Sequence, residues 1–235
     1  MPLANPLFPV FLKLEQLRVL LVGGGNVGLE KLTAILRNSP GTAVTVVSLT
    51  FLPALRTLAA RHPAVQLHVG PYDDAYLVEA DVVFAATDDP ALHRRIKAAA
   101  RARRLLVNVA DTPALCDFYL SSVVQKGALK VAVSTNGQSP TVAKRLRAVL
   151  EETLPEELDA VLRKMPAIRQ QLSGDFARKV KALYAVTAGL TGGSGYVAPA
   201  TRRWRALAMG ALLAAGTLAA ARWGVTPAPP APKTP

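Results

Sequence analysis

The chain has 235 residues, of which 51% are hydrophobic and 19% are charged. This composition excludes an intrinsically disordered protein and allows a folded domain with a sizeable core. The formal net charge is +12 at pH 7. Such a balance suits nucleic acid, a membrane surface or a polyanionic small molecule, and charge alone does not choose among them. The single cysteine, Cys116, excludes an internal disulfide and fits a reducing compartment.

The first 113 residues alternate between short apolar runs and helical patterns. Strands are expected at 18–22, 43–48, 65–69, 81–86 and 105–109, and helices at 26–38, 52–61 and 90–104. This alternation is typical of an α/β domain with a doubly wound parallel sheet, so we expect a Rossmann-type domain over 1–113. No basic stretch followed by an apolar run opens the chain, so no signal peptide is expected.

The pattern changes after residue 113. Two β-rich runs, 117–124 and 129–134, are separated by a short Gly-containing stretch, which predicts a β-hairpin. Ser139 and Pro140 predict the N-cap and first turn of a following helix. The hairpin and helix make up the segment 114–150. A small helical domain is expected over 151–190, its helices punctuated by Pro155 and Pro166.

The remainder predicts a linker, a hydrophobic helix and a tail. Residues 191–202 are rich in Gly, Ser and Pro, and residues 224–235 are rich in Pro. The expected helix at 203–223 contains an uninterrupted uncharged stretch, 206–221, of about 16 residues, against about 20 for a full span. Trp and Arg flank this stretch at both ends. We expect a C-terminal membrane anchor with the preceding domains on the cytoplasmic side. A helix that packs on the protein is the alternative.

A glycine-rich loop follows the first expected strand. Residues 23–28 (GGGNVG) satisfy the pattern G-x-G-x-x-G through Gly23, Gly25 and Gly28. One glycine permits the tight turn, one lets the backbone approach a pyrophosphate, and one lets helix and strand pack closely. The helix N-terminus then offers N–H groups and a positive dipole end to the phosphates. The loop predicts a dinucleotide site, with a glycine turn that binds nothing as the alternative.

The second expected strand ends without the acid that usually binds the adenosine ribose. Ser48 or Thr50 could bind the ribose more weakly, and no Arg is adjacent for a 2′-phosphate, so this strand leaves NAD and NADP open. Thr87, at the carboxyl end of the fourth strand, is a further candidate for cofactor contact. Asp88 and Asp89, before Pro90, are expected to cap the next helix.

Asp111 lies just past the carboxyl end of the fifth expected strand, which is where ligands bind in open α/β sheets. A carboxylate at this point could act as general base or acid beside a nicotinamide. A local role in the turn before Pro113 is the alternative. The residues themselves do not choose between the two.

Four segments together carry a family resemblance: 23–31 (GGGNVGLEK), 84–90 (FAATDDP), 108–122 (NVADTPALCDFYLSS) and 131–147 (VAVSTNGQSPTVAKRLR). Their order and spacing resemble the precorrin-2 dehydrogenase/sirohydrochlorin ferrochelatase family, the module that also forms the front of bacterial sirohaem synthases. The resemblance covers residues 8–165. It departs from the usual family pattern at three places: Gly28, where Ala is usual, Asn136-Gly137, where Gly-Gly is often found, and Ser121, where Pro is usual.

The resemblance implies NAD-dependent oxidation of precorrin-2 to sirohydrochlorin, with insertion of Fe²⁺ in some members. It also implies a homodimer built through 114–150. Asp111 matches the family's essential Asp, the proposed general base. The pairs Asn26-Val27 and Leu49-Thr50 match the family's NAD-contacting residues.

Precorrin-2 is a polycarboxylate, so a basic cleft would attract it. The substrate-binding candidates lie around the expected helix at residue 140: Thr135, Ser139, Lys144 and Arg145. A solvated helix face is the alternative for the two basic residues.

No metal site within the protein is expected, because His62, His68 and His93 share no metal-ligand spacing. Cys116 is expected to be a small core residue. Beyond charge there is no nucleic-acid recognition motif. The alternative to the enzyme is a membrane-tethered nucleotide-sensing module, which would share the glycine loop and would not need Asp111.

Overall fold

The computed structural model describes residues 5–156 and 158–171. The chain divides into two compact units, residues 1–159 and 160–235, and the features below, apart from α5, belong to the first. The expected linker at 191–202, hydrophobic helix at 203–223 and Pro-rich tail lie outside the described residues. Among the helices of the described part, none is long and apolar enough to cross a membrane.

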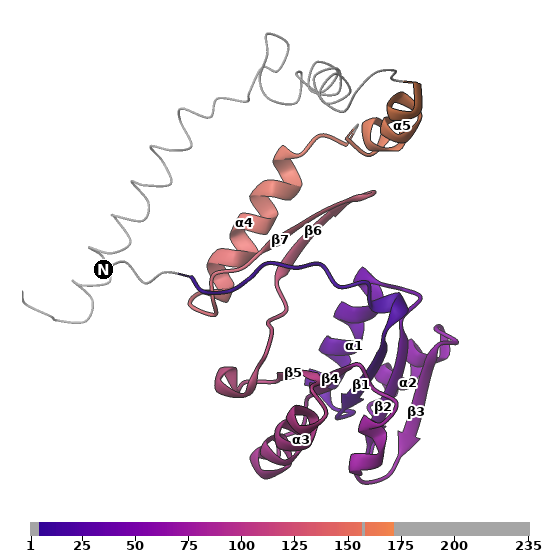
Figure 1. Cartoon of the computed structure of the whole chain (residues 1–235), viewed down its shortest axis with the longest axis vertical. Helices are drawn as coiled ribbons and strands as arrows, with labels where there is room; N and C mark the ends of the chain where they lie inside the picture. Colours follow the sequence, from indigo (N-terminus) through magenta and orange to yellow (C-terminus); the bar gives the residue numbers. More distant parts are fainter. Residues whose placement is uncertain (1–4, 157, 172–235) are drawn as a thin grey trace, which may run out of the picture. The chain divides into compact units, whose positions relative to one another are not determined.

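Within the described residues, a sheet of five parallel strands forms in the order β3-β2-β1-β4-β5 (Figure 1). The strands are β1 (Arg18–Val22), β2 (Ala43–Ser48), β3 (Val65–Val69), β4 (Val82–Ala85) and β5 (Leu106–Val109). The helices that follow β1, β2 and β4 are α1 (Asn26–Asn38), α2 (Pro53–Ala60) and α3 (Pro90–Ala102). The chain builds outward from β1 on one side and then returns to add β4 on the other. The doubly wound parallel sheet predicted from the sequence is confirmed.

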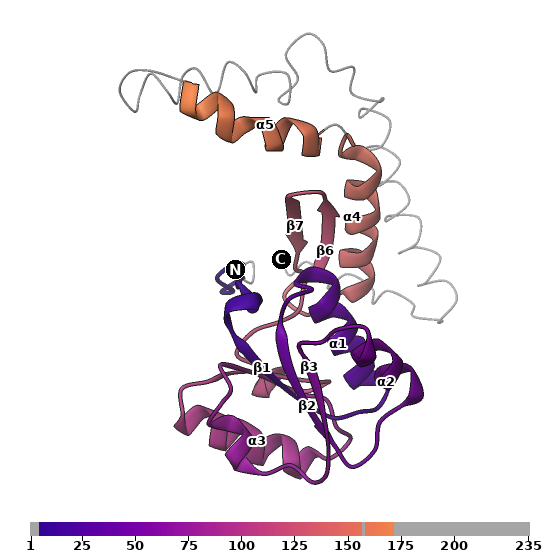
Figure 2. The same ribbon diagram turned by 90° about the vertical axis from the view of Figure 1, so that its right-hand side faces the viewer.

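The central strands β1 and β4 are largely apolar and buried, because helices cover both faces of the sheet. Successive side chains of a strand point to opposite faces, so Val19 and Leu21 of β1 pack with α1 and α2, whereas Leu20 and Val22 face α3. Figure 2 shows α3 on one side of the sheet and α1 and α2 on the other. The carboxyl ends of β1, β4 and β5 are therefore held by strands that are buried along most of their length.

A hairpin and a helix follow the sheet: β6 (Ser122–Lys126), β7 (Leu129–Val133) and α4 (Pro140–Thr153). The two-residue turn has Gly127 at φ +55° in its first central position, as a type II′ turn requires. Ser139 caps α4 by accepting from the backbone N–H of Val142 at 3.2 Å, as predicted.

Two predicted boundaries are wrong. Residues 117–121 are not part of a strand, because they turn back along β5 instead of entering the hairpin. Pro166 does not separate two helices, because it lies inside α5 (Leu158–Gln171). For residues 117–121 the physical reason is the bonding of Asp117 to Val107 at the edge of β5.

Candidate functional site

The carboxyl ends of β1, β4 and β5 bring the glycine loop, Thr87 and Asp111 to one edge of the sheet. The backbone N–H of Ala86 donates to Val22 O at 2.7 Å, and that of Ala110 donates to Ala85 O at 2.9 Å. The strand order reverses between β1 and β4, and ligands of open α/β sheets bind at such a switch point. The geometry therefore places the sequence-predicted cofactor loop and the candidate acid at the expected crevice.

The three motif glycines have three different physical roles. Gly23 has φ +122°, and a Cβ there would stand 2.2 Å from Ala86 O. A Cβ on Gly28 would stand 2.1 Å from Gly23 O, so Gly28 lets α1 approach β1 closely. A Cβ on Gly25 would meet nothing within 4 Å, so Gly25 faces open space. A pyrophosphate could approach the protein backbone closely at this position. This assignment matches the roles of the dinucleotide-binding loop.

Gly24 is a fourth required glycine that the motif did not identify. A Cβ at Gly24 would stand 2.3 Å from Thr50 O. The Gly24 N–H donates to Ser48 Oγ at 3.0 Å, and its carbonyl oxygen accepts from Leu52 N at 3.0 Å. The pattern G-x-G-x-x-G leaves this position free, so only the contact with the β2–α2 loop reveals the requirement.

The first turn of α1 is suited to an anion. Its N-cap, Gly25, makes no side-chain capping bond, and the turn contains no acidic residue. Asn26 is exposed and Val27 half-buried at the beginning of this helix. Uncapped N–H groups and the positive helix end favour a phosphate at this point. These residues fit the pyrophosphate of a dinucleotide.

The end of β2 presents polar and apolar groups beside the loop. The Ser48 hydroxyl accepts from Gly24 and can still donate through its own O–H. Leu49 is 69% exposed, and Thr50 is exposed as well. The Arg56 guanidinium lies 5.3 Å from the ring centroid of Phe51. Sequence reasoning missed this cation, because one turn of α2 brings it back toward the loop.

Thr87 begins a turn that is fixed by its neighbours. Its backbone N–H donates to His93 Nε2 at 3.3 Å, and its hydroxyl accepts from Asp89 N at 3.4 Å. Asp89 caps α3, as predicted, and the N–H groups of Leu92 and Ala91 hold the pKa of its carboxyl below the ordinary value. His93 is buried, so it belongs to the core.

Asp111 occupies a left-handed backbone conformation, with φ +52°, immediately after buried Ala110. Its carboxylate is exposed and, among the described residues, takes part in no hydrogen bond or ion pair. The next short helical turn has Thr112 at its N-cap and no side-chain cap. The alternative of a carboxylate that closes this turn therefore finds no support in the contacts.

The candidate substrate residues form a turn and the helix that follows it. Asn136 and Gly137 have φ +54° and +74°, and Gln138 N donates to Thr135 O at 3.1 Å, which matches a type I′ turn. Thr135 Oγ1 accepts from Ser139 N at 3.2 Å and lies 3.1 Å from Ser139 O. Thr135 and Ser139 thus shape the turn.

Lys144 and Arg145 are exposed on α4. Over the described ranges, no hydrogen bond or ion pair joins either residue to Asp111, and no group of three or more His, Cys, Asp or Glu could hold a metal ion. The structure therefore brings the cofactor candidates and Asp111 to one edge of the sheet, and the substrate candidates lie in the turn before α4 and on α4 itself.

The comparisons with known proteins agree with this geometry. A family model for an NAD(P)-binding domain matches residues 10–122, which defines the class of the sheet domain. The model for the central part of sirohaem biosynthesis proteins matches residues 126–153. The chain belongs to the family of NAD(P)-binding and central modules found in sirohaem synthases.

Relatives include siroheme synthases from Psychrobacter arcticus, 36% identical over 177 residues, and Salmonella schwarzengrund, 37% identical over 169 residues. These alignments cover 74% and 72% of this chain, but only 30% and 36% of the relatives. The chain thus spans about a third of the length of these proteins. A solved structure of SirC, a precorrin-2 dehydrogenase, shares the fold, with a TM-score of 0.64 and 23% identity over 77% of this chain and 89% of that one.

Proposed function

We propose that this protein catalyses the NAD-dependent oxidation of precorrin-2 to sirohydrochlorin. One observation carries the proposal: the glycine loop and the unpaired carboxylate of Asp111 share one edge of the sheet in a member of the sirohaem synthase family. The siroheme synthase relatives and the shared fold of a precorrin-2 dehydrogenase support it.

In this proposal the loop and the first turn of α1 hold the pyrophosphate. Gly23 and Gly28 set the shape of the loop, while Gly25, Asn26 and Val27 face the phosphates. At the end of β2, Leu49 packs on the adenosine, and Ser48 and Thr50 bind its ribose. Thr87 lines the crevice from β4. When bound, NAD⁺ supplies the acceptor for a hydride.

Asp111 is the proposed base. Oxidation of precorrin-2 removes two electrons as a hydride and releases a proton, so NADH and one proton form per turnover. An exposed carboxylate with no competing partner can accept that proton from the substrate. Its place beyond the end of β5, next to β4, suits the substrate side of the nicotinamide.

The carboxylates of the substrate are proposed to meet the turn at Thr135 and Ser139 and the basic side chains Lys144 and Arg145. Both basic residues are exposed, and Lys and Arg bind carboxylates through charge-assisted hydrogen bonds. Replacing both by Met is expected to raise KM for precorrin-2 and leave the Kd of NAD⁺ unchanged.

A homodimer is proposed from the exposed side of α4. Val142, Leu146 and Val149 follow helical spacing and are 44%, 47% and 44% exposed. A second copy that covers this stripe would remove it from water. Leu146→Glu should then shift the mass measured by light scattering from dimer to monomer.

The proposed C-terminal anchor at 203–223 lies outside the described residues. It is tested by fractionating cells that express the full chain or a chain ending at residue 190. Retention of the full chain, but not the shortened one, in the membrane fraction would support the anchor.

The decisive experiment is anaerobic turnover by the full chain with precorrin-2 and NAD⁺, followed by NADH absorbance and the sirohydrochlorin spectrum. Asp111→Asn keeps the shape and tolerates positive φ, so it should bind NAD⁺ normally and lose about 100-fold or more in kcat. Parallel assays with NADP⁺ and with added Fe²⁺ test the cofactor choice and a chelatase activity. NAD⁺ binding without any turnover would favour a nucleotide-sensing module.

A further inference from the structure

The segment that carries Asp111, residues 110–118, turns back after β5 and bonds to the free edge of that strand. We call this segment the reversal. Asp117 N donates to Val107 O at 2.8 Å, and Val107 N donates to the Asp117 carboxylate at 2.9 Å. The Val109 N–H is directed at Cys116 Sγ, 3.2 Å away. β5 is the last strand of the sheet, so these contacts satisfy N–H groups that no strand pairs. Asp111 stands at the apex of this reversal.

A second group of contacts fixes the far end of the reversal against the sheet. The Asn108 side-chain amide donates to Phe118 O at 2.9 Å. The ring of Phe118 packs edge-on against Phe84 of β4, with centroids 5.5 Å apart. The reversal is therefore tied to β5 through Asn108 and to β4 through Phe84.

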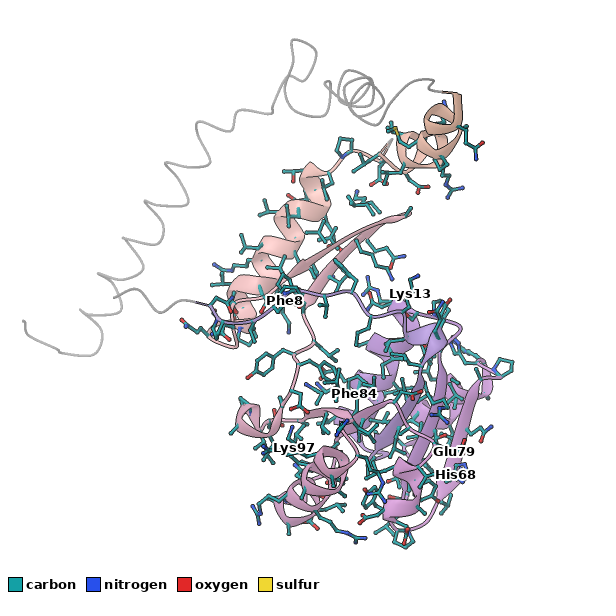
Figure 3. The ribbon with its side chains drawn as sticks, viewed as in Figure 1. Phe8, Lys13, His68, Glu79, Phe84 and Lys97 are labelled. Carbon is teal, nitrogen blue, oxygen red and sulfur yellow. The ribbon has the colours of Figure 1, made fainter. Side chains whose placement is uncertain are left out.

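Lys97 of α3 completes the closure. Its Nζ donates to the Asp117 carboxylate oxygen that does not bind Val107, at 2.5 Å. The Lys97 side chain is only 17% exposed and that of Asp117 34%, so this pair is better shielded than the other ion pair of α3, Arg95–Asp74, at 54% and 40%. Figure 3 shows Lys97 on α3 at the side of the segment that follows β5.

We propose that Asp117, held by Lys97, is a positioning residue that places the Asp111 carboxylate for proton transfer. No described side chain holds that carboxylate, so its position follows from the backbone alone. The backbone at Asp111 is left-handed, a conformation that the surrounding structure must maintain. The bonds of Asp117 close the reversal, and they therefore decide where Asp111 points.

This inference rests on the proposed oxidation of precorrin-2. The test compares two variants. Asp117→Ala loses both side-chain bonds, the one from Val107 N and the one from Lys97 Nζ, whereas Asp117→Asn keeps an oxygen that can accept from Val107 N. Lys97→Met removes only the ion pair. Arg95→Met is the matched control, because it breaks an ion pair of the same helix that does not touch the reversal.

Kinetics are measured on the full chain at a temperature where circular dichroism shows each variant folded. We expect Asp117→Ala to lose at least about tenfold in kcat, Lys97→Met to lose less, and Asp117→Asn to recover most of the loss. The Kd of NAD⁺ should stay within about twofold of wild type in every variant. The kcat of the control, Arg95→Met, should also stay within about twofold of wild type. Wild-type kcat in Asp117→Ala, a joint loss of kcat and NAD⁺ affinity, or no rescue by Asp117→Asn would overturn the inference.

Hydrogen exchange separates this inference from the proposed function. If the wild-type protein does not oxidise precorrin-2, the proposed function is wrong, and the positioning role is judged by exchange instead. Asp117→Ala should speed amide exchange at 107–112 and leave exchange in β1 unchanged. Equal exchange at 107–112 in both proteins would overturn the role of Asp117.

Discussion

Gly23 lies directly against the carbonyl oxygen of Ala86, at the point where β1 and β4 end. A Cβ on Gly23 would stand 2.2 Å from that oxygen, and the residue has φ +122°. No side chain fits without moving one of the two strands. The crevice between these strands therefore depends on a glycine whose role is steric and does not require contact with a ligand.

Gly23→Ala is expected to destabilise the fold. The added methyl meets backbone atoms that cannot rotate away, and an L residue is strained at this φ, so the loss should be about 2 kcal/mol or more. Urea denaturation followed by circular dichroism measures the effect. An unchanged midpoint would show that β4 can shift without cost.

Gly25→Ala is the matched variant for ligand binding. Its φ is −84°, and its Cβ meets nothing within 4 Å, so the free energy of unfolding should stay close to wild type. The methyl would occupy the space that a pyrophosphate needs, so the Kd of NAD⁺ should rise at least about tenfold. Isothermal titration calorimetry gives this value, and wild-type affinity would place the phosphates elsewhere.

Arg104→Gly is expected to stabilise the protein. Arg104 has φ +60° just after α3, where Arg104 N bonds Arg101 O and Leu105 N bonds Ala100 O, both at 3.0 Å. These bonds define a Schellman motif, whose left-handed position favours Gly. Relief of the strain should add about 1 kcal/mol to the free energy of unfolding. Arg103→Gly, at φ −100°, is the control and should not stabilise.

Acid should remove the contribution of the Arg18–Asp81 pair. The Arg18 side chain and backbone N–H donate to the Asp81 carboxylate and lower its pKa from the ordinary 3.8 to about 2. A depressed pKa means that the stabilisation is complete above about pH 4 and is lost as the pH falls through about 2. The difference in urea midpoint between wild type and Asp81→Asn should therefore shrink between pH 4 and pH 2. A constant difference would contradict the assignment.

Local sequence patterns were sufficient to predict the sheet domain and the glycine loop that follows β1. Short apolar runs bounded by glycine, polar or capping residues indicate buried strands and the helices between them. The helices predicted at 26–38 and 90–104 agree with α1 and α3 to within two residues. Gly23, Gly25 and Gly28 were recognised because the spacing G-x-G-x-x-G is a local pattern, although the steric need for Gly23 comes from Ala86 O at the end of β4. Ser139 and Asp89 were recognised as caps for the same reason.

Contacts between segments that lie far apart in the sequence could not be predicted in the same way. The need for Gly24 comes from the carbonyl of Thr50, and the position of Arg56 comes from the packing of α2 over Phe51. The hairpin was predicted to begin at residue 117, but Asp117 is bound to the edge of β5, where Val107 and Lys97 meet it. Secondary-structure propensity depends on a residue and its near neighbours in the sequence. The segment that bonds to an unpaired strand edge depends instead on which residues the tertiary structure places beside that edge.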